Sequence, residues 1–230
     1  MFPSKNFEST KKSGLRRIGR RIICSLATCI IGLGVAAFLL GFACSMLGPS
    51  SPRFGSSICL PLSLPEDVGT DESERIYVGL QFYSRIQVYD SNGEFIYGFF
   101  AKTDGGRFRM RVERNGSLTI ASARTHSIHV YDNTGQLLSS KQNAKETYDQ
   151  FVSQQPLVNV DSRGRHYLIR GSVMNPEIVR EDRNGHISLR IKTPLWFRPF
   201  LGPIPCFITT IVVALLQRLS RWLLIRVGRH

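Results

Sequence analysis

The polar middle of this chain, which has the composition of a folded domain, contains almost no cysteine. The sequence holds five cysteines, of which four lie in apolar segments and only Cys59 lies in the polar middle. A lone thiol cannot form a disulfide within this middle part, and pairing of Cys59 with a second chain is the alternative to a free thiol. The sequence also lacks a G-x-S-x-G nucleophile elbow, a phosphate-binding loop and the Cys/His spacing of a zinc site. These absences argue against the enzymes and zinc proteins that such motifs mark.

Charged residues are absent from Ile22–Leu47, a run of 26 residues. A helix of about 20 apolar residues crosses a hydrocarbon core of about 30 Å, so the run predicts a transmembrane helix. The alternatives are a cleaved signal peptide, whose apolar region would be shorter, and a lipoprotein signal ending at Cys44. A second apolar run, Pro199–Gln217, has 19 residues and predicts a second crossing, with an interfacial helix as the alternative.

Acidic residues are absent from Arg198 to the end of the chain, where five arginines give a net charge of +5. The first 21 residues carry seven Lys/Arg and one Glu, a net charge of +6, which leaves the middle only +2 of the total +13. Positive charge therefore flanks the apolar runs, which predicts both termini in the cytoplasm and a lipid bilayer as partner. A nucleic-acid-binding protein would concentrate this charge on its folded domain, so no nucleic acid is expected.

The expected fold class is a membrane-anchored all-β protein, with about three propeller-blade-like sheets of antiparallel β-meander between two transmembrane helices. We expect it in the cell membrane with two spans and an extracytoplasmic β domain. The predicted parts are a basic cytoplasmic tail (1–21), a first transmembrane helix (22–47), a Pro/Ser-rich linker (48–69), a β-repeat domain (70–193), and a second transmembrane helix with a basic tail (199–224).

Short alternating β runs separated by Asp/Asn-Gly turns fill the middle of the chain. One unit recurs three times, at 84–98, 126–140 and 176–190, and its first two copies are offset by 42 residues. Further hairpins at 109–122 and 157–170 precede the second and third copies. A period of 40–50 residues with about four strands in each unit is typical of propeller blades.

The second copy resembles the NHL-type propeller repeat, through Val112–Ala121 followed by Ser127–Asp132 and Gly135. The first copy matches the second half of that repeat, through Arg85–Asp90 and Gly93, and the third copy is degraded. Closed propellers of this kind have at least four blades, whereas three are present here. The resemblance therefore implies either an open fan of sheets or a ring closed between two chains.

Two features favour a homo-oligomer. Exposed strand edges would give chains a reason to pair. The small residues Gly32, Ala36, Gly41 and Ser45 would let two helices approach closely.

Three aspartates, Asp90, Asp132 and Asp182, lie at matching positions and could be mistaken for catalytic carboxylates. Each precedes a glycine by three residues, where an Asp side chain accepts backbone hydrogen bonds in a turn, so a structural role is expected. The acidic cluster before the repeats lacks the ligand spacing of a calcium loop, and we expect a solvated surface. Its members are Glu66, Asp67, Asp71, Glu72 and Glu74.

The histidines do not predict a metal site. His126 and His129 are three residues apart on a strand, so they point to opposite faces and cannot chelate one ion together. His166, His186 and His230 are isolated. Asn115-Gly116-Ser117 is a formal glycosylation sequon placed in an expected turn. No catalytic, cofactor-binding or metal-binding residue is therefore predicted.

The function expected from the sequence is the presentation of a β-propeller-like domain for protein or ligand binding, without catalysis. One alternative is a membrane-tethered, metal-dependent lyase or hydrolase, because some NHL-type propellers carry such sites. Another is a shortened, diverged propeller paralogue. A protein partner outside the membrane is also expected.

Overall fold

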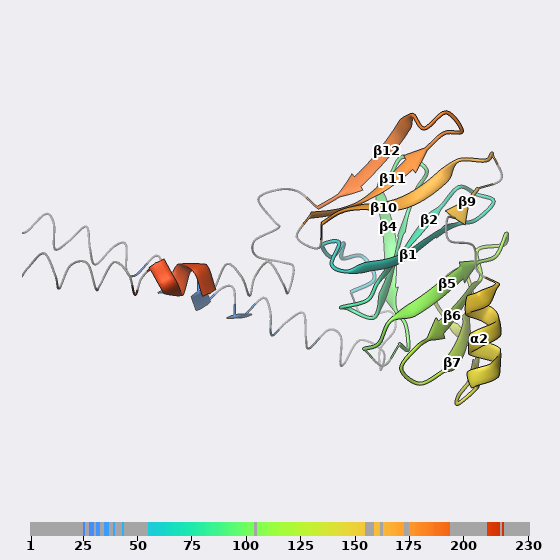
Figure 1. The fold of residues 1–230 in the computed structure, drawn as a ribbon, viewed down its shortest axis with the longest axis horizontal. Coiled ribbons are helices and arrows are strands. Elements are labelled where there is room, and N and C mark those ends of the chain that lie inside the picture. The colour runs from blue at the N-terminus through green and yellow to red at the C-terminus, as the bar shows by residue number, and fades with distance from the viewer. Residues whose placement is uncertain are drawn as a thin grey trace, which may run out of the picture.

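The computed structural model describes residues 55–103, 105–154, 159–161, 163–172 and 175–193 (Figure 1). It also describes nine positions between Ser25 and Ala43, and residues 211–216 and 218. The strands form three four-stranded antiparallel sheets, called A, B and C in chain order. In each sheet, strands that follow one another in the sequence are neighbours. The predicted all-β architecture of repeated meanders is therefore confirmed.

The elements have the following bounds. Sheet A contains β1 (Pro65–Thr70), β2 (Ile76–Leu80), β3 (Arg85–Tyr89) and β4 (Phe95–Phe100). Sheet B contains β5 (Phe108–Val112), β6 (Leu118–Ser122), β7 (Ser127–Tyr131) and β8 (Leu137–Lys141). Helix α2 (Lys145–Ser153) follows, and sheet C contains β9 (Asn159–Val160), β10 (His166–Ser172), β11 (Asn175–Glu181) and β12 (Ile187–Lys192).

One turn recurs between the third and fourth strands of every sheet. In sheet A, Asp90 Oδ1 accepts the backbone N–H of Asn92 at 2.9 Å and that of Glu94 at 2.8 Å. Asp132 and Asp182 accept the equivalent N–H groups in sheets B and C. The glycine three residues later has a positive φ in each copy: 83° at Gly93, 81° at Gly135 and 77° at Gly185. The predicted structural role of the three aspartates is confirmed.

Sheet A is the middle of the three sheets, with sheet C on one face and sheet B on the other (Figure 1). Alternation along β3 directs Ile86 and Val88 towards sheet B, and Arg85, Gln87 and Tyr89 towards sheet C. The core between A and B includes Tyr77, Phe99, Phe108, Met110, Leu118, Ile120 and Tyr131. The core between A and C includes Val68, Ile76, Val78, Leu80, Phe100, Tyr167, Ile178 and Ile191.

The order of packing, C–A–B, differs from the order along the chain. A Cβ atom built on Gly93 of sheet A would lie 3.0 Å from Ile191 Cγ1 of sheet C. One built on Gly135 of sheet B would overlap the ring of Phe99 of sheet A, whereas one on Gly185 of sheet C would have no neighbour within 4 Å. The three sheets, packed in the order C–A–B, are here called the arc. Sheet C thus covers the turn of sheet A, and sheet A covers the turn of sheet B. Among the described residues nothing covers the turn of sheet C, so the arc is open between B and C.

The face of sheet B that points away from sheet A is covered by α2. The guanidinium of Arg111 lies 4.7 Å from the ring centroid of Phe151, and the ring of Tyr148 stands edge-on to His126 at 5.3 Å. Phe151 is buried. The N-cap residue Ala144 makes no side-chain hydrogen bond to the helix. Since the sequence showed no strong helix signal here, α2 was not predicted.

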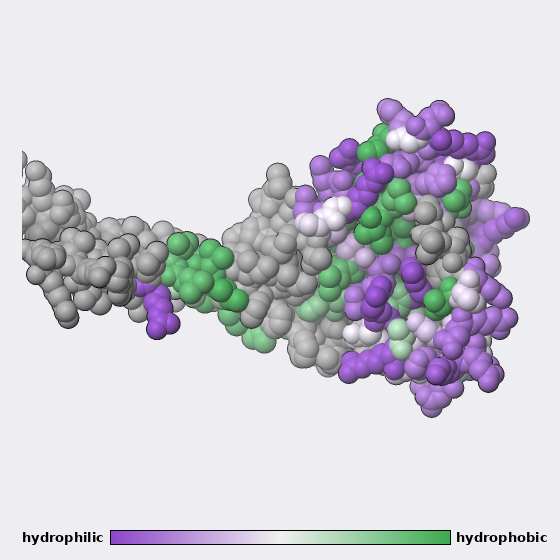
Figure 2. Space-filling model, in the orientation of Figure 1, coloured by the Kyte–Doolittle hydropathy of each residue, from purple (hydrophilic) through white to green (hydrophobic). Residues whose placement is uncertain are grey.

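The opposite end of the arc, the free face of sheet C, is covered by charged side chains. Arg170 pairs with Glu181 at 2.6 Å, and Arg190 lies 3.8 Å from Glu177. Val179 on the same face is fully buried. In Figure 2 hydrophilic side chains cover much of sheets C and B, while hydrophobic residues show in the band between them. Terminal units of repeat proteins commonly end in a polar face of this kind.

The structure corrects the prediction of two transmembrane helices and of a two-span localisation. Described helical residues occur at scattered positions from Ser25 to Ala43 and at 211–216, and no described helix is long and apolar enough to cross a membrane. Six helical residues extend about 9 Å, against the roughly 30 Å of a hydrocarbon core. Most of 22–47 and 199–224 lies outside the described residues, as do Cys44 and part of the small-residue stripe.

Candidate functional site

The segment 55–62, here called the arm, lies against the face of sheet A that points towards sheet C. The Gln87 side chain accepts the backbone N–H of Leu60 at 2.9 Å and donates to the carbonyl of Leu60 at 2.9 Å. Arg85 donates to the carbonyls of Gly55 and Ile58 at 2.8 and 2.9 Å. The arm had been expected to be part of a spacer, and β1 begins inside that spacer at Pro65. These contacts hold the arm by its backbone.

Arg85 is 1% exposed, which is rare for an arginine. Its guanidinium lies 4.8 Å from the ring centroid of Phe100, and the carbonyls of the arm replace part of its lost hydration. A Cβ atom at Gly98 would lie 2.7 Å from Arg85 Nη2, so a glycine is needed beneath the guanidinium. The sequence signal for this site is the polar alternation Arg85, Gln87, Tyr89, which was used only as a repeat marker.

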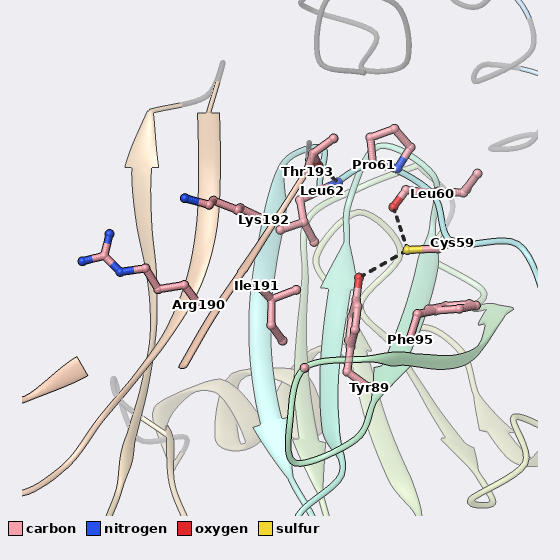
Figure 3. Close-up of a pocket in the computed structure, with 11 residues that line it drawn as sticks. Cys59, Leu60, Pro61, Leu62, Tyr89, Phe95, Arg190, Ile191, Lys192 and Thr193 are labelled. Carbon is pink, nitrogen blue, oxygen red and sulfur yellow. Dashed lines mark hydrogen bonds between the residues drawn. The ribbon is translucent and has the colours of Figure 1, made fainter. Parts of the chain in front are cut away.

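A cavity of about 450 Å³, here called the A/C cleft, opens between the arm and sheets A and C (Figure 3). It is lined by Cys59–Leu62 of the arm, by Tyr89 and Phe95 of sheet A, and by residues 190–193 of sheet C. Ile191 points towards Tyr89, whereas the side chains of Arg190 and Lys192 point away to the free face of sheet C (Figure 3). The walls are therefore mainly apolar, and the volume is in the range of small-ligand sites.

Two polar groups face one another in the A/C cleft. The hydroxyl of Tyr89, a residue 3% exposed, lies 3.9 Å from Cys59 Sγ. Burial raises the pKa of Tyr89 well above its ordinary value, and the neighbouring thiol raises it further. Burial also raises the pKa of the Cys59 thiol, against the opposing effects of Tyr89 and Arg85. Both groups are therefore protonated at neutral pH, so Cys59 is not an activated nucleophile.

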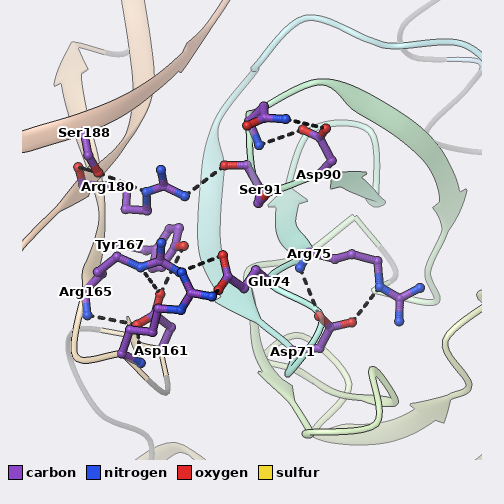
Figure 4. A network of polar contacts seen from close by, with 12 residues as sticks. Asp71, Glu74, Arg75, Asp90, Ser91, Asp161, Arg165, Tyr167, Arg180 and Ser188 are labelled. Atoms are coloured by element: carbon purple, nitrogen blue, oxygen red, sulfur yellow. Dashed lines mark hydrogen bonds and ion pairs between the residues drawn. The ribbon is translucent and has the colours of Figure 1, made fainter.

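Sheets A and C are also joined by polar contacts beside their shared core (Figure 4). Glu74 of sheet A lies 2.5 Å from Arg163 and 3.1 Å from Arg165 of sheet C. Arg180 donates to the carbonyl of Ser91 at 2.9 Å. On the arm side, the N–H of Leu62 donates to Thr193 Oγ1 at 2.9 Å. These contacts join sheets A and C, and the contact between Leu62 and Thr193 lies in the wall of the A/C cleft.

Asp161, Arg165 and Tyr167 form a group that repeats the arrangement of Asp71, Arg75 and Tyr77 in sheet A. Arg165 Nε donates to Asp161 at 2.6 Å, and Arg75 Nε donates to Asp71 at 2.7 Å. Burial raises the pKa of Asp161, but the N–H and guanidinium of Arg165 outweigh it and leave the pKa below its ordinary value. The group supports the turn from which Arg165 reaches Glu74.

Asp67 joins the innermost strands of all three sheets. From β1 its carboxylate accepts the N–H of Met110 on β5 at 2.9 Å and the amide of Asn159 on β9 at 3.2 Å. It is 5% exposed, and burial raises its pKa despite these hydrogen bonds and the charge of Arg109. Asp67 therefore has a structural role.

The acidic cluster is distributed among structural partners. The interpretation as a solvated surface is wrong for Asp67 and Asp71, each 5% exposed. Glu66 pairs with Arg107 at 2.7 Å, and Glu72 lies 3.9 Å from Arg114. Within the described ranges no group of three or more His, Cys, Asp or Glu could hold a metal ion.

The described histidines and the sequon lie at different places in the fold, and none of them lines the A/C cleft. His126 lies in the turn before β7 and not on a strand as predicted, and its ring contacts Tyr148 of α2. His129 is 2% exposed and lies on the face of β7 towards sheet A. His166 and His186 lie on sheet C and its turn, and His230 lies outside the described residues. Asn115 Oδ1 accepts the N–H of Ser117 at 3.0 Å, which confirms its place in a turn.

A second cavity, of about 440 Å³, lies where β1, β5 and β9 end. Its walls include Thr70, Val112 and Val160, the last residues of the three strands. The buried carboxylates beside it, Asp71 and Asp161, already accept hydrogen bonds from Arg75 and Arg165. The A/C cleft is therefore the better candidate for a ligand site.

No protein-family model matches the chain, and no curated protein matches its sequence. Among solved structures, it is similar to a streptogramin B lyase, with 13% identity over 60% of this chain and 43% of that chain and a TM-score of 0.33. Its similarity to hydrazine synthase of Kuenenia stuttgartiensis has 13% identity over 60% of this chain and 38% of that chain, with a TM-score of 0.31. Its similarity to virginiamycin B lyase of Staphylococcus aureus has 13% identity over 56% of this chain and 41% of that chain, with a TM-score of 0.29.

The chain spans less than half the length of these structures. Likenesses this distant carry no argument about activity. The propeller-like description rests on the three meander sheets, which are consistent with a β-propeller-type repeat. Membership of the NHL-type family stays a prediction.

Proposed function

We propose that this chain is a non-catalytic binding protein whose β domain takes an apolar ligand carrying a hydrogen-bond acceptor. The A/C cleft carries the proposal, because it combines apolar walls with one buried phenol at a volume suited to a small ligand. The Tyr89 hydroxyl would donate to the acceptor, while Leu60, Leu62 and Ile191 would contact the apolar part. The NHL-type character of the repeats belongs to the same proposal and rests on sequence alone.

A lyase or hydrolase is not proposed, because no observation favours it. In the A/C cleft the thiol and the phenol are both protonated at neutral pH, and neither lies beside a general base among its lining residues. The open sector between sheets B and C supports the description of the domain as a shortened propeller. A ring closed by a second chain is not part of the proposal, since α2 and ion pairs cover the two faces that further blades would need.

The test is binding of the fluorescent ketone prodan to the full chain, since prodan is neutral, apolar and carries a carbonyl acceptor. Tyr89→Phe removes one hydrogen bond, worth about 0.5–1.5 kcal/mol, so prodan affinity should fall about 2- to 12-fold. Ile191→Phe fills the cleft and should lower the affinity further. The matched control is Tyr148→Phe on α2, which keeps the ring and lies outside the cleft. Equal affinity in all four proteins would contradict the proposal.

A further inference from the structure

We propose that the natural ligand of the A/C cleft is an extended peptide with alternating apolar and acidic residues, which pairs with the edge strand β12. This inference rests on the proposed function and names its ligand class. Three independent observations support it: the arm, the position of β12, and the contrast between its apolar face and its basic face.

The A/C cleft already holds a segment of this chain, the arm, through contacts to its backbone. Gln87 bonds to both backbone groups of Leu60, and Arg85 to the carbonyls of the arm. The N–H of Gly98 on the edge strand β4 also donates to the carbonyl of Ser56 at 2.8 Å. Backbone groups occur in every peptide, so the site is built for peptide chemistry and has unfilled space beside the arm.

On the other side of the A/C cleft, β12 is the edge strand of sheet C. In the described part of the chain its only ladder partner is β11, which leaves one edge of its backbone available. A strand added about 4.8 Å away would place every second side chain on the face shared by Leu189 and Ile191. Ile191 on that face lines the A/C cleft, so alternate apolar residues of the peptide would enter the cleft (Figure 3).

The intervening residues of the peptide would share the opposite face with Arg190 and Lys192. Within the described residues, Arg190 has one ion-pair partner, Glu177 at the long distance of 3.8 Å, and Lys192 has none. Cross-strand neighbours of opposite charge are stabilising, so acidic residues are favoured at these positions. The ligand pattern is therefore apolar–acidic–apolar–acidic.

Strand β8, the edge of sheet B, provides a comparison. Leu138 on this strand is 60% exposed, and four of the five residues of β8 are exposed. No described residue of β8 lines the A/C cleft. Lys141 ends β8 as Lys192 ends β12, and it donates to Thr147 Oγ1 of α2 at 3.2 Å, so Lys141→Glu serves as a control for the change of charge at the end of an edge strand.

The experiment uses the full chain and fluorescein-labelled Leu-Glu-Leu-Glu-Leu-Glu-Leu, followed by fluorescence anisotropy and by displacement of prodan. A block peptide of the same composition measures attraction to the basic ends of the chain. Two further peptides are N-methylated on alternate amides: one at the odd-numbered amides and the other at the even-numbered amides. Alternate amides of a strand point to opposite edges, so ladder pairing predicts that only one of these peptides loses affinity, by tenfold or more.

Lys192→Glu should lower the affinity for the acidic peptide about two- to fivefold and raise the affinity for its Leu-Lys counterpart. Lys141→Glu should leave the ratio of these two affinities unchanged. Equal binding of both N-methylated peptides, or equal effects of the two lysine variants, would overturn the inference. Prodan binding that depends on Tyr89 and Ile191 but is not displaced by the peptide would also overturn it. In that case the proposed function would stand with a small molecule as ligand.

Discussion

Replacing Gly135 and Gly185 separately by alanine distinguishes the cost of a turn from the cost of packing between sheets. Both glycines end an Asp-x-x-Gly turn, with φ values of 81° and 77°. Alanine must adopt a left-handed conformation at either position, at a cost of about 1 kcal/mol. Because the two turns share sequence pattern and backbone conformation, this cost should be the same in both variants.

The surroundings of the two turns differ. A methyl group at Gly135 would overlap the ring of Phe99, whereas one at Gly185 would meet nothing within 4 Å. Overpacking a close-packed core typically costs about 1–3 kcal/mol. We therefore expect Gly185→Ala to lower the free energy of unfolding by about 1 kcal/mol, and Gly135→Ala by about 2–4 kcal/mol.

Urea unfolding of the full chain, followed by circular dichroism of its β-sheet band, measures both changes. A double variant identifies the cause: once Phe99→Ala has removed the ring, Gly135→Ala should cost only the turn term of about 1 kcal/mol. Equal losses in the two single variants would refute the packing order C–A–B, because sheet A would then not cover the turn of sheet B.

Three further predictions follow from buried polar groups. Asp161→Asn should lower the free energy of unfolding by about 1–3 kcal/mol at neutral pH. Since the folded pKa of Asp161 is depressed, its contribution is present above the unfolded value of 3.8 and is lost as the pH falls through the folded pKa, so wild type and variant should converge in acid. Asp67 has a raised folded pKa, so the wild type should lose stability relative to Asp67→Asn as the pH rises above 3.8, and a flat difference would contradict this. Gln87→Ala removes both hydrogen bonds to Leu60, and hydrogen exchange of the Leu60 amide should accelerate at least tenfold; unchanged protection would show that Gln87 does not hold the arm.

At the ends of the chain the hydropathy of the sequence and the described structure disagree. The uncharged run Ile22–Leu47 is long enough to cross a bilayer, yet the described structure contains no helix that could do so. The helix that is described in full, α2, gave no signal, because it depends on the packing of Phe151 and Tyr148 against sheet B.

The candidate site was only partly visible in the sequence. Alternation correctly indicates that Arg85, Gln87 and Tyr89 share a face of β3. It does not identify what lies opposite that face, and here the arm and sheet C come from sequence positions before and far after β3. The arm itself has the composition of a spacer, and the buried side chains that hold it act on its backbone.

The sequence by itself determined the repeated unit. The Asp-x-x-Gly turns depend on hydrogen bonds within five residues and on a glycine at positive φ, and the strands depend on local alternation, so three four-stranded meanders could be read from the chain. Only the tertiary structure decided that sheet C packs on sheet A instead of following sheet B, and that a cleft forms between them. The physical reason is that alternation assigns side chains to faces, whereas contacts between faces depend on the fit of residues such as Phe99 and Ile191 against turns distant in sequence.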